Sequence, residues 1–405
     1  MAELERYDVI VVGMGAAGSS AVYQLARRGS KVLGIDQFEP PHTLGSTHGE
    51  TRITRQAIGE GDHYTPLSLR SYEIFRELEQ ITGEHLLDVT GGLMISSPGA
   101  TGVNNVSNFF ETTLAAAKKH SIPHEVLNVD QMRRRFPQFR VQDNEIGYYE
   151  VESGVLRPEA CVRATLSMAA NNGATLKINE KMLEYSEDAS GVVVKTDKGE
   201  YHADKLVLTV GPWLPQIVGE ELKSRFKVYR QVLFWFDISD NYDRFKLGNF
   251  PIFIWDGQGE RDSIYGFPAV DGQEGGIKIA SEEYVTEVTP ENVDRSVSQE
   301  EIDKMYEKQI VPCFPGVGKD CVKSAVCMYT MTPDSGFVID FMPGSSRTIV
   351  CSPCSGHGFK HSAAVGECVA ELARDGKTTL NIEPLRIDRR AMVPSTNESP
   401  MRFPA

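Results

Sequence analysis

The residues with the clearest chemical signal lie near the start of the chain, in the stretch YDVIVVGMGAAGSSAVYQLARRGSKVLGIDQ. Gly13, Gly15 and Gly18 form a GxGxxG pattern between an expected buried strand and an expected helix. The first glycine permits a tight turn, the second lets the backbone approach a pyrophosphate, and the third permits close packing of helix on strand. The N–H groups at the start of the helix bind phosphates, so the stretch predicts a dinucleotide site.

Asp36 ends the second expected strand, where a carboxylate can accept hydrogen bonds from the ribose hydroxyls of a bound adenosine. Its negative charge disfavours a 2′-phosphate, which argues against NADP. We expect Ala16, Ala17 and Gln37 to line the same site. The motif alone does not separate FAD from NAD, and a tight strand–helix turn without a ligand is the alternative.

A second strand, glycine turn and helix occurs near the other end of the chain. The turn contains Gly356 and Gly358, and the helix is expected from about Lys360. Just before it, Cys351 and Cys354 have the spacing of metal ligands. No second CxxC and no histidine pair at zinc-finger spacing accompany them, so we expect no metal site and assign this pair to the end of a buried strand.

One further cysteine raises a question that the residues alone leave open. Cys327 begins the stretch CMYTMTPDSGFVID, in which a turn at Thr-Pro-Asp is followed by an apolar run. A buried cysteine on a strand is a small apolar side chain, whereas a cysteine that faces a cofactor is a nucleophile.

The elements that must position these residues follow from hydrophobic periodicity and turn signals. Aromatic residues crowd the stretch 226–281, where most of them should form the core of an antiparallel sheet and some could line a substrate site. The expected elements are a strand at 8–12, helices at 63–83, 105–120 and 158–172, a strand at 92–97, strands between 174 and 211, and an alternating sheet over 226–281.

Composition excludes several classes of function. The 405 residues carry a net charge of −14, which disfavours nucleic-acid binding, and no apolar run reaches membrane-spanning length. Acidic residues precede the first apolar stretch where a signal peptide would be positively charged. Seven cysteines is an odd and low count for a secreted scaffold, so we expect reduced thiols and a cytoplasmic protein.

Four blocks give the sequence a resemblance to the glycine/D-amino-acid oxidase superfamily of FAD enzymes, and within it to sarcosine and N-methyltryptophan oxidases. These blocks are GMGAAG, PPHTLGSTHGETRITRQAIGEG, CMYTMTPDSGFVID and GHGFKHSAAVGE. The likeness spans nearly the whole chain. It implies an α/β (α+β) fold, with a Rossmann-like FAD-binding domain and an interleaved antiparallel-sheet substrate domain. The implied division is 1–85, 150–220 and 320–390 for FAD, 86–149 and 221–319 for substrate, and a tail at 391–405.

The resemblance implies that FAD is bound covalently, through an 8α-S-cysteinyl link at Cys327. A thiolate is a strong nucleophile that can attack the oxidised flavin methyl position. A buried free cysteine stays as the alternative. Besides the residues of the first glycine motif, the implied FAD contacts are His42, Ser46, Thr47, Arg52, Gly356, His357, Gly358, Phe359 and Lys360.

The resemblance also implies a substrate site. Arg55, in TRITR, and Lys360 would hold the substrate carboxylate, because a guanidinium pairs with a carboxylate in a fork and an ammonium adds a point charge. Arg52 would lie near the flavin face, and Lys278 would activate oxygen by stabilising developing superoxide. Tyr265 and Tyr329 would line the pocket. Surface ion pairs for the arginines, and a solvent-facing Lys278, are the alternatives.

One departure from the family pattern bears on the substrate. Where the sarcosine and N-methyltryptophan oxidases carry a histidine, four residues after the lysine, this sequence has Glu282. The neighbouring Glu283 leaves the register open by one residue. A carboxylate at this place could recognise a cationic group, or it could point away.

The function implied is oxidation of the C–N bond of a secondary, N-methylated amino acid by a monomeric enzyme. The resulting imine hydrolyses to an amine and an aldehyde, and O₂ becomes H₂O₂. Alternatives are an oxidase of a cyclic imino acid such as pipecolate, a dehydrogenase that uses another electron acceptor, a flavin-bearing protein without turnover, and a plain NAD dehydrogenase. The last would leave Cys327 and the second glycine turn unexplained.

Overall fold

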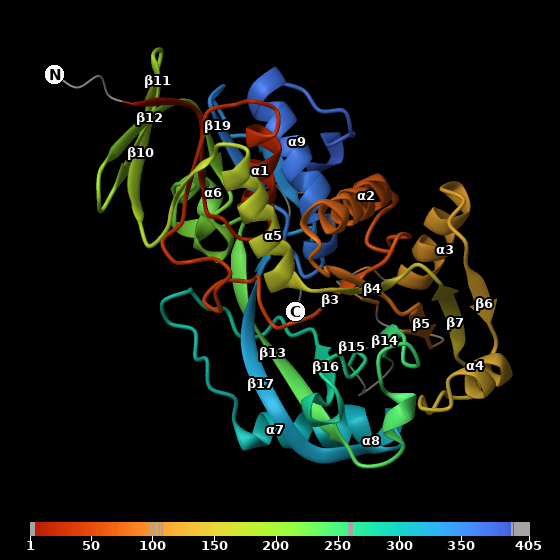
Figure 1. The fold of residues 1–405 in the computed structure, drawn as a ribbon. Helices are drawn as coiled ribbons and strands as arrows, with labels where there is room; N and C mark the ends of the chain where they lie inside the picture. The colour runs from red at the N-terminus through yellow and green to blue at the C-terminus, as the bar shows by residue number, and fades with distance from the viewer. Residues whose placement is uncertain are drawn as a thin grey trace, which may run out of the picture.

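The computed structural model describes residues 5–97, 99–100, 102–103, 106, 108–257, 262–389 and 392, which contain two large sheets and one small sheet (Figure 1). The first large sheet has a parallel centre, in which β1 lies between β2 and β12. β12 pairs with β11 through its first half and with β19 through its second half. The strands of this sheet are β1 (Arg6–Val12), β2 (Val32–Ile35), β9 (Thr175–Lys177), β10 (Met182–Asp188), β11 (Gly191–Thr196), β12 (Glu200–Leu208), β18 (Val338–Phe341) and β19 (Thr348–Ser352).

Helices α1 (Ala16–Ala26), α5 (Pro158–Asn171) and α9 (Ser362–Asp375) pack together beside this sheet (Figure 1). The close approach of α1 to α9 needs Gly366, where an added Cβ would lie 2.3 Å from Cβ of Ser20. Helix α2 (Thr65–Thr82) packs on α9 and ends at Gly83, whose left-handed conformation (φ 71°) closes the helix as its sequence predicts. Apolar side chains of all four helices and of the sheet share one core.

The second large sheet is mostly antiparallel and contains the aromatic stretch. Phe139, Phe253, Trp255 and Phe314 pack together as the expected sheet core. Its strands, in spatial order, are β17 (Val317–Met331), β13 (Lys227–Ile238), β16 (Ile277–Ser281), β15 (Ile264–Phe267), β14 (Ile252–Asp256), β5 (Gly92–Ser96), β7 (Ile146–Glu150) and β6 (Glu125–Leu127). A small sheet joins β3 (Arg52–Thr54), β8 (Gly154–Leu156) and β4 (Leu87–Val89).

The remaining α-helices are short. The helix expected at 105–120 is described as α3 (Phe109–Lys119), and residues 105 and 107 lie outside the described part. The others are α4 (Val129–Arg135), α6 (Glu220–Lys223), α7 (Gln299–Met305) and α8 (Val311–Cys313). Among the described residues no helix is both long and apolar enough to cross a membrane.

The long strands β13 and β17 run side by side, antiparallel, and reach from the first sheet down to α7 (Figure 1). Their register sets Cys327 opposite Gln231 and Tyr329 opposite Tyr229. The expected division at 319/320 cuts through β17, although the whole strand belongs to the second sheet. The division into domains stays a prediction, and the tail at 391–405 lies outside the described residues except for Met392.

Candidate active site

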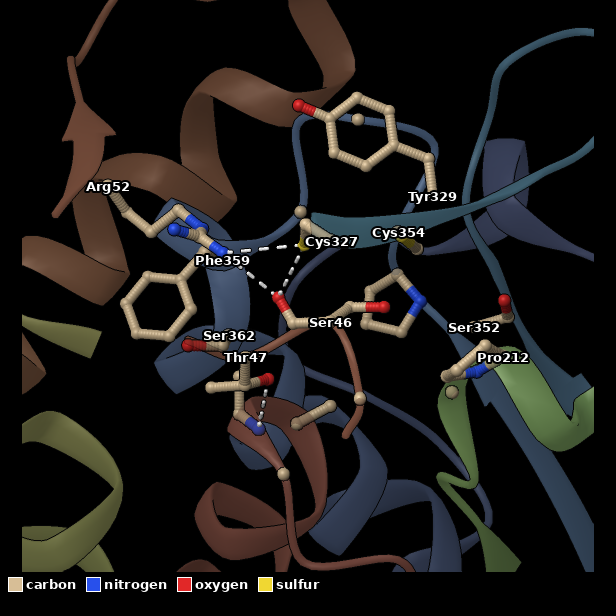
Figure 2. A pocket seen from close by; sticks show the side chains of 18 of the residues that line it. Ser46, Thr47, Arg52, Pro212, Cys327, Tyr329, Ser352, Cys354, Phe359 and Ser362 are labelled. Carbon is tan, nitrogen blue, oxygen red and sulfur yellow. Dashed lines mark hydrogen bonds between the residues drawn. The ribbon is translucent and has the colours of Figure 1, made fainter. Parts of the chain in front are cut away.

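A cavity of about 510 Å³ is lined by residues of both large sheets and of both glycine turns. Figure 2 shows side chains from the N-terminal segment, from β17 and from the second glycine turn converging on it. Nearly all residues that the sequence singled out line this cavity, Gly18 being an exception. Gly18 instead permits the close packing of α1 against the end of β1, since a Cβ there would lie 1.7 Å from the carbonyl oxygen of Gly13.

The end of the cavity next to α1 fits a dinucleotide. A Cβ on Gly13 would lie 2.5 Å from the carbonyl oxygen of Thr209, so this tight turn requires glycine. Asp36 at the end of β2 is held by the backbone amides of Met14 (2.6 Å) and Phe38 (2.9 Å). The Ser46 hydroxyl is buried on the cavity wall without a partner among the described residues. A polar cradle of this kind suits a phosphate-bearing ligand.

Cys327 is buried on β17, and its sulfur lies against Arg52. Arg52 Nη2 is 3.9 Å from Cys327 Sγ and donates to the carbonyl oxygen of Ser46 at 3.0 Å (Figure 2). The thiol itself lies 3.6 Å from the same oxygen. Cys327 therefore has a place on a strand and also a place on the cavity wall beside a cation.

Lys278 on β16 is buried, with 2% of its surface exposed, so it does not point to solvent. Its Nζ donates to the carbonyl oxygens of Gly49 (2.7 Å) and Thr51 (3.1 Å) and to the Thr51 hydroxyl (3.2 Å). The ammonium also lies 4.9 Å from the centre of the Phe267 ring. Burial lowers the pKa of Lys278 well below its usual value, and the charge of Arg52 lowers it further.

Arg55 and Lys360, the expected carboxylate clamp, both contact Glu60. Arg55 is fully buried, forms an ion pair with Glu60 and donates to the carbonyl oxygen of Ala57 at 2.6 Å. Lys360 Nζ lies 3.8 Å from the same carboxylate and donates to the carbonyl oxygen of His357 at 2.7 Å. The segment that carries Arg55 therefore also supplies a carboxylate, Glu60, to both cations. Sequence reasoning missed Glu60, although it lies in the AIGEG part of the second block.

The charges of this cluster shift one another's pKa values. Burial lowers the pKa of Lys360 to about 8, an effect that Glu60 opposes and Arg55 reinforces. Burial favours the neutral acid at Glu60, yet Arg55 and Lys360 hold its pKa well below the usual value. Glu60 is thus a carboxylate at neutral pH, and Lys360 titrates in a range where enzymes work.

Two tyrosines and a carboxylate line another part of the cavity. The hydroxyl oxygens of Tyr265 and Tyr329 lie 3.0 Å apart, and burial raises the pKa of Tyr265 to about 12, so it stays protonated. Glu282 lines the cavity and accepts a hydrogen bond from Tyr284 at 3.0 Å. Glu283 instead contacts Gln231 through its backbone N–H, at 3.0 Å. The sequence left open whether Glu282 or Glu283 takes this place, and it is Glu282 that lines the cavity.

All seven cysteines lie in the described part of the chain, and none forms a disulfide. Cys351 is buried in β19, while Cys354 faces the cavity and its sulfur accepts from the Thr330 N–H at 3.3 Å. The described residues contain no group of three or more His, Cys, Asp and Glu side chains that could hold a metal ion.

Comparison with known protein families decides which class of enzyme this cavity belongs to. The profile of the FAD dependent oxidoreductase family matches residues 8–372. The chain belongs to this family. The polar cradle beside α1 fits the FAD of such an oxidoreductase by its glycine turn and by the Ser46 hydroxyl.

Relatives of this FAD-dependent oxidoreductase match it over nearly their full length. It is 40% identical over 374 residues to the monomeric sarcosine oxidase of Streptomyces avermitilis, which covers 92% of this chain and 94% of the relative. It is 32% identical over 390 residues to the N-methyl-L-tryptophan oxidase of Salmonella heidelberg, which covers 95% of this chain and 99% of the relative. These matches confirm the family inferred from the four blocks.

Solved structures of other flavoenzymes share the fold. The open form of NikD, an unusual amino acid oxidase essential for nikkomycin biosynthesis, has a TM-score of 0.80 at 25% identity and covers 94% of this chain and 97% of its own. The L-proline dehydrogenase of P. horikoshii has a TM-score of 0.76 at 21% identity and covers 95% of this chain and 97% of its own. The α/β fold class with an antiparallel-sheet second part is confirmed.

Proposed function

We propose that this flavoenzyme oxidises the C–N bond of a secondary, N-methylated amino acid and uses O₂ as the electron acceptor. The observation that carries the proposal is the pair of buried cations, Arg55 and Lys360, on the same cavity as Cys327 and Lys278. The single carboxylate of Glu60 offsets one of these two positive charges. The net positive charge that is left on the cavity wall favours an anionic substrate group. The names of the sarcosine and N-methyltryptophan oxidase relatives support the same substrate class.

Four side chains of the cavity have parts in substrate binding. Arg55 and Lys360 hold the substrate carboxylate, which replaces part of their contact with Glu60. Tyr265 and Tyr329, both protonated at neutral pH, bound the space for the amine and its N-alkyl group. The low-dielectric surroundings favour the neutral amine over the ammonium form, so the substrate needs no separate protein base.

FAD, when bound, would accept the two electrons that the substrate loses when its C–N single bond becomes C=N, and would pass them to O₂. In the overall reaction the amine loses two electrons and two protons and O₂ gains both as H₂O₂. Water then hydrolyses the imine to a primary amine and an aldehyde, which is formaldehyde if the N-substituent is methyl. Lys278 contributes a positive charge where oxygen gains electrons.

Cys327 is proposed as the covalent attachment point of FAD. Its sulfur lies on the cavity wall, 3.9 Å from Arg52 Nη2, which supports an attachment at this position (Figure 2). The residues proposed to hold the cofactor without a covalent bond are Gly13, Gly15, Ala16, Ala17, Asp36, Gln37, His42, Ser46, Thr47, Gly356, His357, Gly358 and Phe359.

The carboxylate of Glu282 favours a substrate that carries a second positive charge. It lies on the cavity wall where the sarcosine and N-methyltryptophan oxidases carry a histidine, and its negative charge acts on Lys360 as well. A basic N-methylated amino acid would bring one cation to Glu282 and one carboxylate to Arg55 and Lys360. We infer further that the protein works as a monomer in the cytoplasm, consistent with its unpaired thiols.

The proposal is tested by product analysis under air. Purified enzyme is mixed with sarcosine, N-methyl-lysine, pipecolate and proline, and peroxide and aldehyde are measured together. An N-methyl amino acid should give one formaldehyde for each peroxide. Turnover of a cyclic imino acid with peroxide but no released aldehyde would support the alternative substrate class. Substrate oxidation without peroxide would show that another electron acceptor is used.

A further inference from the structure

The carbonyl groups that hold Lys278 belong to a turn with strained backbone. Gly49 (φ 97°) and Glu50 (φ 69°) both have left-handed backbone conformations, which cost energy for a residue other than glycine. The turn folds back on itself, because the Thr51 N–H donates to the Gly49 carbonyl oxygen at 2.7 Å. This same oxygen also accepts from Lys278 Nζ. Both of these hydrogen bonds use the Gly49 carbonyl oxygen, and a further group holds the N–H side of the turn.

That group is Glu159, at the start of α5. Its Oε1 accepts hydrogen bonds from the backbone N–H of Gly49 at 2.8 Å and of Glu50 at 3.1 Å. The donors are the two left-handed residues of the turn. The Glu50 N–H belongs to the same peptide as the Gly49 carbonyl oxygen, so the carboxylate fixes from one side a peptide that binds Lys278 from the other. Glu159 itself stands in the first turn of a helix whose first residue is Pro158, which gives its position a rigid base.

Charge adds a second link between Glu159 and Lys278. The ionisable groups that face Lys278 are Arg52 on β3, Cys327 on β17 and Glu159 on α5. His48 is close enough to feel its charge, and Lys323 shares the Trp235 ring with it. Burial and Arg52 lower the pKa of Lys278, and Cys327 and then the Glu159 carboxylate oppose this lowering.

We propose that Glu159 is a positioning residue for Lys278: it holds the Gly49–Glu50 turn, whose Gly49 carbonyl oxygen accepts from Lys278 Nζ. The inference rests on the proposed role of Lys278 in the reaction with O₂. It goes beyond that role by assigning the oxygen site a partner on a different element, more than a hundred residues away in the chain. Glu159 touches neither substrate nor oxygen in this scheme.

The chain offers a matched control in Glu150, on β7. This buried carboxylate accepts from the N–H groups of Gln56 (2.6 Å) and Ala57 (3.1 Å), at the other end of the same segment and beside Arg55. Glu150→Gln should therefore weaken substrate binding, whereas changes at Glu159 should act on the reaction with O₂. Glu159→Gln keeps an acceptor for both amides and removes only the charge, and Glu159→Ala removes both.

The test measures flavin reduction by substrate and flavin reoxidation by O₂ separately, by stopped flow on the holoenzymes. Glu159→Ala should slow reoxidation roughly tenfold, the scale on which groups that orient a charged site act, and leave reduction nearly unchanged. In Glu159→Gln the fall of the reoxidation rate with rising pH should move to lower pH, because Lys278 loses its proton more easily. Hydrogen exchange of the 49–52 amides should speed up in Glu159→Ala and stay slow in Glu159→Gln.

Each contrary result has its own meaning. Unchanged reoxidation in Glu159→Ala overturns the proposal, and so does an unmoved pH profile in Glu159→Gln. The proposal also fails if Glu159→Ala and Glu150→Gln both slow reduction and reoxidation to the same extent. If Lys278→Met also reoxidises normally, the proposed role of Lys278 fails as well. The exchange measurement does not depend on turnover, so unchanged exchange in Glu159→Ala refutes the anchoring even in an enzyme that is inert toward O₂.

Discussion

Arg52 Nη2 lies 3.9 Å from Cys327 Sγ, and both groups meet at the carbonyl oxygen of Ser46. This contact joins the N-terminal segment to β17, although the two residues are 275 positions apart in the sequence. It places the sulfur of Cys327 on the cavity wall beside a cation, where the proposed link to FAD would form.

Cys327→Ser should therefore bind FAD without a covalent bond. After acid precipitation the yellow colour should pass into the supernatant, whereas the wild-type protein should keep it in the pellet. Cys354→Ser is the control, because Cys354 also faces the cavity but lies against the Thr330 amide. Flavin released from the wild-type protein by acid would refute the covalent link.

Glu60→Gln tests the competition between Glu60 and the substrate for Arg55 and Lys360. Removing one partner of a buried ion pair destabilises a protein by about 3–5 kcal/mol, so the melting temperature should fall. The two cations should then bind a substrate carboxylate roughly tenfold more tightly, a gain of about 1.4 kcal/mol. A carboxylic acid ligand should stabilise Glu60→Gln more than the wild type in thermal unfolding. Weaker binding in the variant would mean that Glu60 instead orients the cations for the substrate.

The affinity for carboxylates should depend on pH through Lys360, whose pKa burial lowers to about 8. Lys360 is charged below this pKa and loses its charge as the pH rises through it. The Kd of a carboxylic acid without an amine should be constant at lower pH and then rise, by up to about tenfold per pH unit. Lys360→Met should bind weakly at every pH and show no such rise. The pH range from about 6 to about 10 spans this lowered pKa and approaches the ordinary pKa of lysine. A wild-type Kd that does not change over this range would contradict the clamp.

Lys278→Met should slow the reaction of the reduced enzyme with O₂ by about 100-fold, the effect of removing a preorganised charge from a site of developing negative charge. Reduction by substrate should change much less. Lys323→Met is the control, since Lys323 also lies over the Trp235 ring but is half exposed and pairs with Glu50. An equal loss in both half-reactions of Lys278→Met would contradict an oxygen-site role.

The local features of the fold could be predicted from the sequence. The turn at Gly13 and the helix end at Gly83 depend on neighbouring residues, and periodicity and turn chemistry identify them. The alternation of residues 227–281 likewise predicted β13 to β16. Arg52, Arg55 and Lys360 lie in the family blocks, and Lys278 is implied by the family resemblance outside them. The structure brings all four to one cavity.

What could not be predicted are contacts between distant segments. Glu150 and Glu159 read as ordinary residues near a strand end and a helix start, and only the fold shows that both bind amides of the segment 49–57. The pairing of β13 with β17, about ninety residues apart, cannot be seen in local patterns either, because these strands meet only when the second sheet forms. Glu60 is the exception, since it lies five residues from its partner Arg55.

The central claim is that this cavity oxidises secondary amino acids by transfer of electrons to FAD, and anaerobic mixing tests it most directly. The yellow enzyme is mixed without oxygen with sarcosine, larger and basic N-methyl amino acids, pipecolate, proline and glycated amino acids, while flavin absorbance is recorded. The account predicts rapid bleaching by an N-methyl amino acid, with the colour restored when O₂ is admitted. A flavin that stays yellow with every carboxylate-bearing amine would contradict it.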